Sequence, residues 1–181
     1  MLIRPADEAD AQALAAIYGH HVLHGFGTFE EAPPEPAEME QRRRAFTAHG
    51  LPWLVAEEAG RVLGYAYAGP FRPRAAYRYA VEDSVYVAPD ALGKGVGRAV
   101  LTAVLEACQA MGLRQAVAVI GDSQNAASIG LHRALGFQPA GVGRSLGFKH
   151  GRWVDIVWMQ KALNGGDASA PDAPGLTLSG H

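Results

Sequence analysis

The chain has 181 residues, of which 49% are apolar, and a formal net charge of -2. That length suits one domain with a full-sized core, and the apolar content argues against disorder over most of it. A charge so close to zero gives no electrostatic reason to expect nucleic acid or an anionic membrane as a partner. The single cysteine, Cys108, excludes an internal disulfide, and no apolar stretch approaches membrane-spanning length. We therefore expect a soluble, cytoplasmic protein.

Strand and helix patterns alternate along the chain up to residue 163. Alternating and β-branched segments predict strands over residues 1–4, 53–57, 61–68, 77–87, 114–120, 137–147 and 153–160. Apolar faces at helical spacing predict helices over residues 7–20, 36–48, 98–112 and 125–135. Asp7 is a suitable N-cap for the first helix, and Gly50 a suitable stop for the second. Neighbouring early strands and a central βαβ unit indicate a mixed α/β sheet.

The chain ends in a segment of different composition. From Asn164 onward it turns to Gly, Ala, Ser, Pro and Asp without periodicity. Such a segment buries too little apolar surface to fold by itself. We expect one domain over residues 1–163 and a disordered tail over residues 164–181.

A glycine-rich loop joins the strand over 77–87 to the next helix, and reads Val-Ala-Pro-Asp-Ala-Leu-Gly-Lys-Gly-Val-Gly over residues 87–97. Gly93, Gly95 and Gly97 lack Cβ atoms, so the backbone there can turn sharply and approach phosphate oxygens. Free N–H groups at the positive end of a helix dipole attract anions. The loop therefore predicts a pyrophosphate cradle around residues 93–98.

Other glycine loops fit less well. A nucleotide P-loop needs Ser or Thr after the lysine, but Gly95 follows Lys94. A dinucleotide fingerprint needs a third Gly or Ala where Val100 stands, although Asp122 lies near the distance of a ribose-binding acid. A plain surface turn does not require three alternating glycines.

Two side chains are candidates for proton transfer. Glu82 lies on the strand that leads into the glycine loop; such a carboxylate is commonly a surface residue, but beside a phosphate cradle it could act as a base. His132 lies on the helix over 125–135, where a lone histidine is more often a surface or core residue than a catalyst. Asn125, at the start of that helix, suits an N-cap.

The glycine loop resembles the signature of the GNAT N-acetyltransferase superfamily, Gln/Arg-x-x-Gly-x-Gly/Ala after a strand, except that Leu92 stands where the family has Gln or Arg. The resemblance covers about the first 163 residues. It implies a GNAT-type α/β fold, with a mixed, largely antiparallel twisted sheet flanked by helices in the order βααβββαβαββ. It also implies acetyl-CoA as co-substrate and no metal. The residues implied for the coenzyme are Val85, Tyr86, Val87, Gly93, Lys94, Gly95, Val96, Gly97, Arg98 and Asn125.

Three further segments resemble the phosphinothricin N-acetyltransferase branch: residues 80–87, 131–137 and 146–155. That branch acetylates the α-amine of phosphinothricin, methionine sulfoximine and methionine sulfone. The resemblance implies Glu82 as general base and direct attack without an acyl-enzyme. His132 stands where the superfamily commonly has a Tyr that protonates the departing thiolate.

Several residues outside these motifs could contact a small amino-acid-like acceptor. The candidates for contact with a carboxylate, a polar head or an aliphatic stem are Phe29, Arg74, Arg78, Tyr79 and Lys149. The family implies a homodimer, and Trp153 is a candidate for its interface. Two alternatives stay open: acetylation of protein amino termini or lysines, and a regulatory module that binds acyl-CoA without catalysis.

Overall fold

A computed structural model describes residues 1–178 of the chain, which build one seven-stranded sheet in the order β1-β2-β3-β4-β5-β7-β6. The strands are β1 (Leu2–Pro5), β2 (Trp53–Glu58), β3 (Arg61–Pro70), β4 (Ala80–Val87), β5 (Gln115–Gly121), β6 (Gln138–Lys149) and β7 (Arg152–Ala162). The α-helices are α1 (Ala11–His24), α2 (Pro36–Thr47), α3 (Val96–Ala110) and α4 (Ala126–Ala134). This is the predicted order of strands and helices, so the predicted fold class is confirmed.

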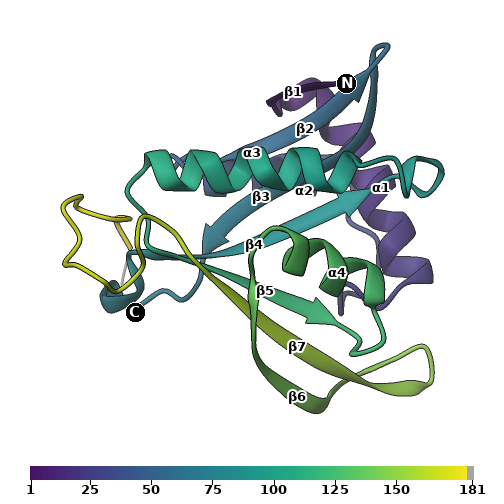
Figure 1. The fold of residues 1–181 in the computed structure, drawn as a ribbon. Coiled ribbons are helices and arrows are strands. Elements are labelled where there is room, and N and C mark those ends of the chain that lie inside the picture. The colour runs from purple at the N-terminus through teal and green to yellow at the C-terminus, as the bar shows by residue number, and fades with distance from the viewer. Residues whose placement is uncertain (179–181) are drawn as a thin grey trace.

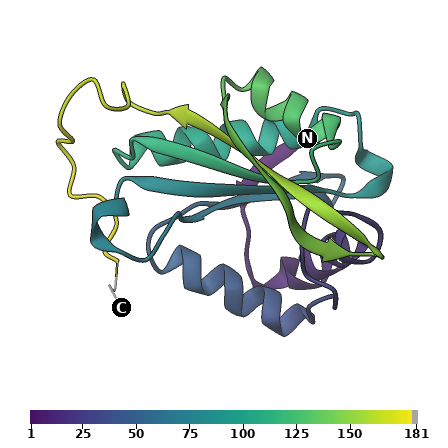
Figure 2. The ribbon, with the colours of Figure 1, turned by 90° about the horizontal axis from the view of Figure 1, so that it is seen from below.

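The helices cover both faces of the sheet (Figures 1 and 2). Helices α1 and α2 lie on one face, while α3 and α4 lie on the other. The core between these layers includes the fully buried side chains of Leu14, Met39, Tyr65, Leu101, Leu113, Phe137 and Met159. β5 is almost wholly apolar, and five of its seven residues are buried, as expected of a strand inside the sheet. Asp7 caps the 3₁₀ turn Glu8–Asp10 that leads into α1, as its position predicts.

The sheet has a gap between β4 and β5, because these two strands pair over only part of their length. They are the parallel pair among antiparallel neighbours, and their register runs only from Ala80 opposite Gln115 to Asp83 opposite Ala118. Beyond that point the two strands diverge, as Figure 1 shows. Over residues 1–178, no strand pairs with 84–87 on the β5 side, although β3 pairs with β4 as far as Val87. A strand edge with free N–H and C=O groups therefore borders a gap in the sheet.

The segment before β4 differs from the predicted strand over 77–87. Residues Ala75–Tyr77 form a 3₁₀ turn, and β4 begins only at Ala80. The Tyr77 N–H donates to Arg74 O and the Arg78 N–H to Ala75 O, so these groups close the turn and are not available for a strand ladder. Arg78 and Tyr79 thus precede the strand.

The end of the chain also differs from the prediction. Residues 164–178 contain no helix or strand, yet they contact the domain beside the turn before β4 (Figure 1). The buried Arg114 guanidinium donates to the carbonyls of Gly166 and Ser169 at 2.8 and 2.9 Å, and Leu176 is buried. Side-chain donors of the domain therefore satisfy carbonyls of irregular backbone, which composition does not reveal. The rest of the predicted tail, 179–181, lies outside the described residues.

No helix within residues 1–178 combines the length and the apolar character needed to cross a membrane. The cytoplasmic location, and the absence of nucleic-acid and membrane partners, stay predictions.

Candidate active site

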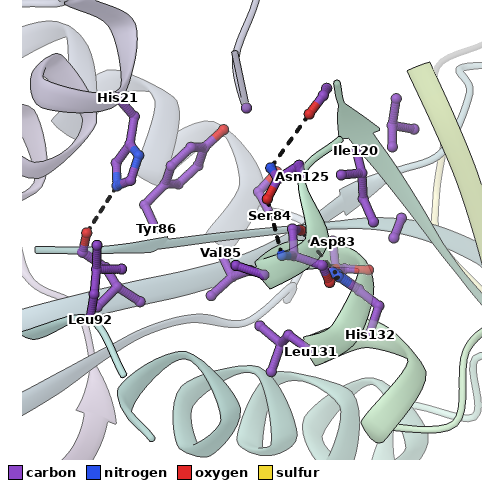
Figure 3. Close-up of a pocket in the computed structure, with 17 residues that line it drawn as sticks. His21, Asp83, Ser84, Val85, Tyr86, Leu92, Ile120, Asn125, Leu131 and His132 are labelled. Atoms are coloured by element: carbon purple, nitrogen blue, oxygen red, sulfur yellow. Dashed lines mark hydrogen bonds and ion pairs between the residues drawn. The ribbon is translucent and has the colours of Figure 1, made fainter. Parts of the chain in front are cut away.

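A cavity of about 210 Å³ occupies the gap between β4 and β5 (Figure 3). β4 contributes residues 83–87 to its wall, β5 contributes 118–121, and α4 with its N-cap contributes Asn125, Ala127, Ser128, Leu131 and His132. The cavity reaches Leu92 at the glycine loop and Gly27 at the loop after α1. Because the strands diverge, this space borders the free edge of β4.

The glycine loop presents free backbone donors at one end of this cavity. The first hydrogen bond of α3 runs from the Ala99 N–H to Gly95 O. The N–H groups of Val96, Gly97 and Arg98 therefore lack partners within the helix and lie at the positive end of its dipole. Gly93 and Gly95 have φ of 74° and 80°, in the left-handed region that suits glycine. An anion such as pyrophosphate fits this arrangement.

Gly97 has a different role from the other two loop glycines. A Cβ atom there would lie 3.3 Å from Val87 Cγ2 and 3.4 Å from Leu131 Cδ2. The absence of a side chain lets α3 approach β4 and α4 closely. Val85 and Val87 point toward this contact, whereas Tyr86 points to the opposite face, where its ring packs edge-on against Tyr18 at 4.9 Å.

His21 on α1 borders the same cavity and was missed from the sequence. Its Nε2 lies 2.9 Å from the Val87 carbonyl oxygen (Figure 3). Burial lowers the pKa of His21, although the bond to Val87 opposes this. The ring is therefore neutral and donates its Nε2–H to that carbonyl. One feature of the sequence could have indicated His21: it lies one turn after Tyr18, on the same face of the first helix.

Glu82 lies one residue before the last paired position of β4, on the opposite face from its neighbour Asp83. It stands opposite Gly69 of β3 and Val117 of β5, and its side chain is 35% exposed. Burial raises the pKa of Glu82; the Arg72 guanidinium, 3.8 Å away, opposes that rise, and the charge of Asp83 adds to it. A half-buried carboxylate of raised basicity suits a general base.

His132 is buried on α4 and forms a pair with Asp83. Its Nε2 lies 2.9 Å from Asp83 Oδ2, and its Nδ1 lies 2.8 Å from the Ser128 carbonyl oxygen. Burial by itself lowers the pKa of His132, but the hydrogen bond and charge of Asp83, with the Ser128 carbonyl, raise it overall. His132 was a candidate in the sequence analysis, but Asp83 was not, because the two residues lie 49 positions apart along the chain.

Asn125 serves as the N-cap of α4. Its Oδ1 accepts from the Ser128 N–H at 3.1 Å, and its Nδ2 donates to Gly121 O at 3.4 Å. The side chain also borders the cavity (Figure 3). Capping is thus confirmed.

The candidates for acceptor binding do not meet in one place. None of the five lines the cavity. Arg78 and Tyr79 face the end of the chain, where the Tyr79 hydroxyl donates to Ala173 O at 2.8 Å. Arg74 is exposed before the 3₁₀ turn. The cation near Glu82 is Arg72, which sequence reasoning missed.

Phe29 and Lys149 hold the loop after α1 against the β6–β7 hairpin. The Phe29 ring fills the space where a Cβ atom on Gly147 would lie. Lys149 is 2% exposed, and its Nζ donates to Thr28 O at 2.8 Å. Burial lowers the pKa of Lys149, while Glu31 and Glu30 oppose that change. This lysine supports the loop rather than offering a free cation.

The part of the chain that the structure describes, 1–178, contains no group of three or more His, Cys, Asp or Glu side chains that could hold a metal ion. The absence of a metal stays a prediction.

Free N–H groups at a helix start, a free strand edge and a half-buried carboxylate thus lie around one gap in the sheet. The chain belongs to the acetyltransferase (GNAT) family, whose model matches residues 18–137. The predicted family and the class of enzyme, an N-acetyltransferase, are thereby confirmed.

The curated relatives and solved structures agree with this family. The chain is 52% identical over 170 residues to a phosphinothricin N-acetyltransferase from Alcaligenes faecalis, covering 94% of this chain and 86% of the relative. It is 42% identical to an L-methionine sulfoximine/L-methionine sulfone acetyltransferase from Salmonella typhimurium, covering 96% and 99%. The crystal structure of a phosphinothricin acetyltransferase from Sinorhizobium meliloti in complex with acetyl-CoA matches with a TM-score of 0.91 and 48% identity, covering 94% and 92%.

Proposed function

We propose that this enzyme transfers the acetyl group of acetyl-CoA to the α-amine of a small amino-acid-like acceptor of the phosphinothricin, methionine sulfoximine or methionine sulfone type. The observation that carries the proposal is the end of the β4–β5 pairing at Asp83 and Ala118, with the anion cradle on one side and Glu82 one residue before that end. The names of the two curated relatives support the acceptor class.

The coenzyme occupies the cavity in this proposal. Its pyrophosphate binds the N–H groups at the start of α3, together with the loop over residues 93–95. Its pantetheine arm extends β4 as an extra strand would, pairing with free groups of residues 85–87. The Val87 carbonyl is already bonded to His21, so the arm uses the other edge groups. The thioester then reaches the point where the strands diverge.

The acceptor approaches from the face of the sheet that carries Glu82. An ammonium group cannot attack a thioester, so Glu82 takes the proton of the amine, directly or through a water molecule. The neutral amine attacks the carbonyl carbon, and a backbone N–H at the strand edge stabilises the oxyanion. No acyl-enzyme forms: Cys108 is buried, and burial, with a smaller effect of the Asp83 charge, raises its thiol pKa to about 12.

Collapse of the tetrahedral intermediate breaks the carbon–sulfur bond and leaves the electron pair on sulfur. His132, at the end of the cavity, gives the thiolate a proton as general acid. The products are the N-acetyl amino acid and coenzyme A. Glu82 releases its proton to solvent, and His132 takes one back.

A thiol-release assay tests the acceptor and the base together. We expect turnover with acetyl-CoA and phosphinothricin, methionine sulfoximine or methionine sulfone. Glu82→Gln should lower kcat by about 10²–10⁴-fold with an unchanged Kd for acetyl-CoA, because the base does not touch the coenzyme. Glu40→Gln, a helix α2 variant away from the cavity, is the control. Turnover of peptides alone would assign the enzyme to protein acetylation. Undiminished turnover in Glu82→Gln would exclude Glu82 as the general base.

The edge of the sheet supports the proposed homodimer. β6 is an edge strand, and large apolar side chains on the β6–β7 hairpin are exposed: Val142, Leu146, Phe148 and Trp153. Such a patch is uncommon on a monomer. Sedimentation analysis of Trp153→Asp should show monomers where the parent chain forms dimers; a monomeric parent chain would contradict the assignment.

A further inference from the structure

Asp83 and His132 form a buried pair at the wall of the cavity (Figure 3). The pair lies on the face of the sheet opposite Glu82, because neighbouring residues of a strand point to opposite faces. Their side chains are 2% and 3% exposed, respectively. Both border the cavity, and Asp83 occupies the last paired position of β4 before the strands diverge. The pair therefore lies where the proposed thioester sulfur arrives.

The contacts of the His132 ring define its protonation state. Nδ1 lies 2.8 Å from the Ser128 carbonyl oxygen, which only accepts, so Nδ1 carries a hydrogen. Nε2 lies 2.9 Å from Asp83 Oδ2, and an ionised carboxylate also only accepts. With the Asp83 carboxylate ionised, both nitrogens donate and the ring is an imidazolium. The raised pKa of His132 agrees with this assignment.

The charge of Asp83 also acts on two groups besides His132. They are the Cys108 thiol on α3, which is neutral because burial raises its pKa, and Glu82 on the far face of the sheet. The Ser128 hydroxyl lies 3.4 Å from Nδ1, and the Phe137 ring packs edge-on against the imidazole at 5.0 Å. β5 contributes Ala118, which is apolar. The charge of His132 therefore depends on Asp83.

Asp83 is poorly explained by packing alone. Its second oxygen, Oδ1, is buried and has no hydrogen-bond partner among the described residues. A buried acceptor without a donor destabilises the fold, and an apolar residue of similar size would avoid that loss. Because the buried carboxylate lowers the stability of the fold, we attribute its presence to its effect on His132.

We propose that Asp83 is a positioning residue for the acid step: it fixes His132 Nε2 beneath the point of divergence and holds the ring protonated until the thiolate forms. This inference rests on the proposed role of His132 as general acid. When the carbon–sulfur bond breaks, the thiolate replaces Asp83 Oδ2 as the acceptor of the Nε2–H. The proton then passes to sulfur and leaves a neutral imidazole, with Nδ1–H still bonded to Ser128. The Nε2 lone pair then faces the Asp83 carboxylate, and this repulsion draws a new proton from solvent.

Asp83→Asn tests the inference with little change of shape, because its amide donates to Nε2 and favours the neutral ring. ¹⁵N NMR of the imidazole, with His132→Gln for assignment, should give a titration midpoint above the ordinary 6.5 in the parent enzyme and below it in Asp83→Asn. The high-pH limb of kcat should move to lower pH by about one unit, a roughly tenfold loss above the limb. The KM for acetyl-CoA should stay unchanged.

Asp10→Asn is the matched control, since Asp10 is as buried as Asp83, at 5% exposure, and is bonded to Arg4. It should lower the melting temperature and leave the pH profile in place. A parent midpoint at or below 6.5, or coincident profiles for the parent and Asp83→Asn, would overturn the inference. Full turnover in His132→Gln would instead remove the acid role on which it rests.

Discussion

Arg72 lies beside the candidate base, and its removal has a calculable effect on the pH profile. The guanidinium Nη1 and Glu82 Oε2 are 3.8 Å apart, with side chains 50% and 35% exposed. At this exposure the dielectric of water applies, so the attraction is about 1 kcal/mol. This positive charge lowers the pKa of Glu82 against the effect of burial. Arg72→Gln should therefore raise that pKa by about 0.7 units or less.

The sign of the change follows from the role of the base. Glu82 acts only when deprotonated, so kcat/KM falls as pH falls through its pKa. In Arg72→Gln the acidic limb should move to higher pH, with about a fivefold loss of kcat/KM below the limb. The assay is thiol release across the acidic range at saturating acetyl-CoA. Arg72→Lys keeps the charge and should leave the limb near its original position. An unmoved limb in Arg72→Gln, or equal shifts in both variants, would refute the coupling.

Three further substitutions probe the loops and the end of the chain. Gly121→Ala would place a Cβ atom 1.9 Å from the backbone oxygen of Phe26. We therefore expect the free energy of unfolding, measured by thermal denaturation, to fall by about 1–3 kcal/mol, and the KM for the acceptor to rise. Gly95→Val, at φ 80°, strains the backbone although the space around it is open, so the free energy of unfolding should fall by about 1–2 kcal/mol. It should also weaken acetyl-CoA binding about tenfold in calorimetry at a temperature where the variant is folded; an unchanged Kd would argue against the cradle. Arg114→Ala removes the donors that hold residues 166–170, so the free energy of unfolding should fall by about 2–3 kcal/mol. Proteolysis after residue 163 should also become faster, and a variant as resistant as the parent would contradict this role of Arg114.

The order of elements followed from the sequence because its signals are local. Alternation, helical periodicity and capping residues such as Asp7 act within a few residues, and each produced the expected element. The glycine loop is equally local, since positive φ at Gly93 and Gly95 reflects conformations that few other residues adopt. Helix α1 ran on to His24 because no residue near His20 stops it.

The site was harder to predict because its contacts join distant segments. The Asp83–His132 bond spans 49 residues, and the His21–Val87 bond spans 66. Pattern alone placed Lys149 among free cations, but tertiary packing buries it under Thr28. Arg114 contacts a segment 52 residues later in the chain, which composition alone predicted to be disordered. Such pairings depend on which strands become neighbours, and one sequence carries no direct signal for that.

The divergence of β4 from β5 has a consequence for inhibitor chemistry. If donor and acceptor enter from opposite faces of the sheet, one compound can pass through the gap between β4 and β5 and occupy the coenzyme site and the acceptor site at once. Coenzyme A joined through a short acetyl spacer to the nitrogen of a methionine sulfone would be such a bisubstrate ligand. Its affinity should exceed that of either half because the second half binds at high effective concentration.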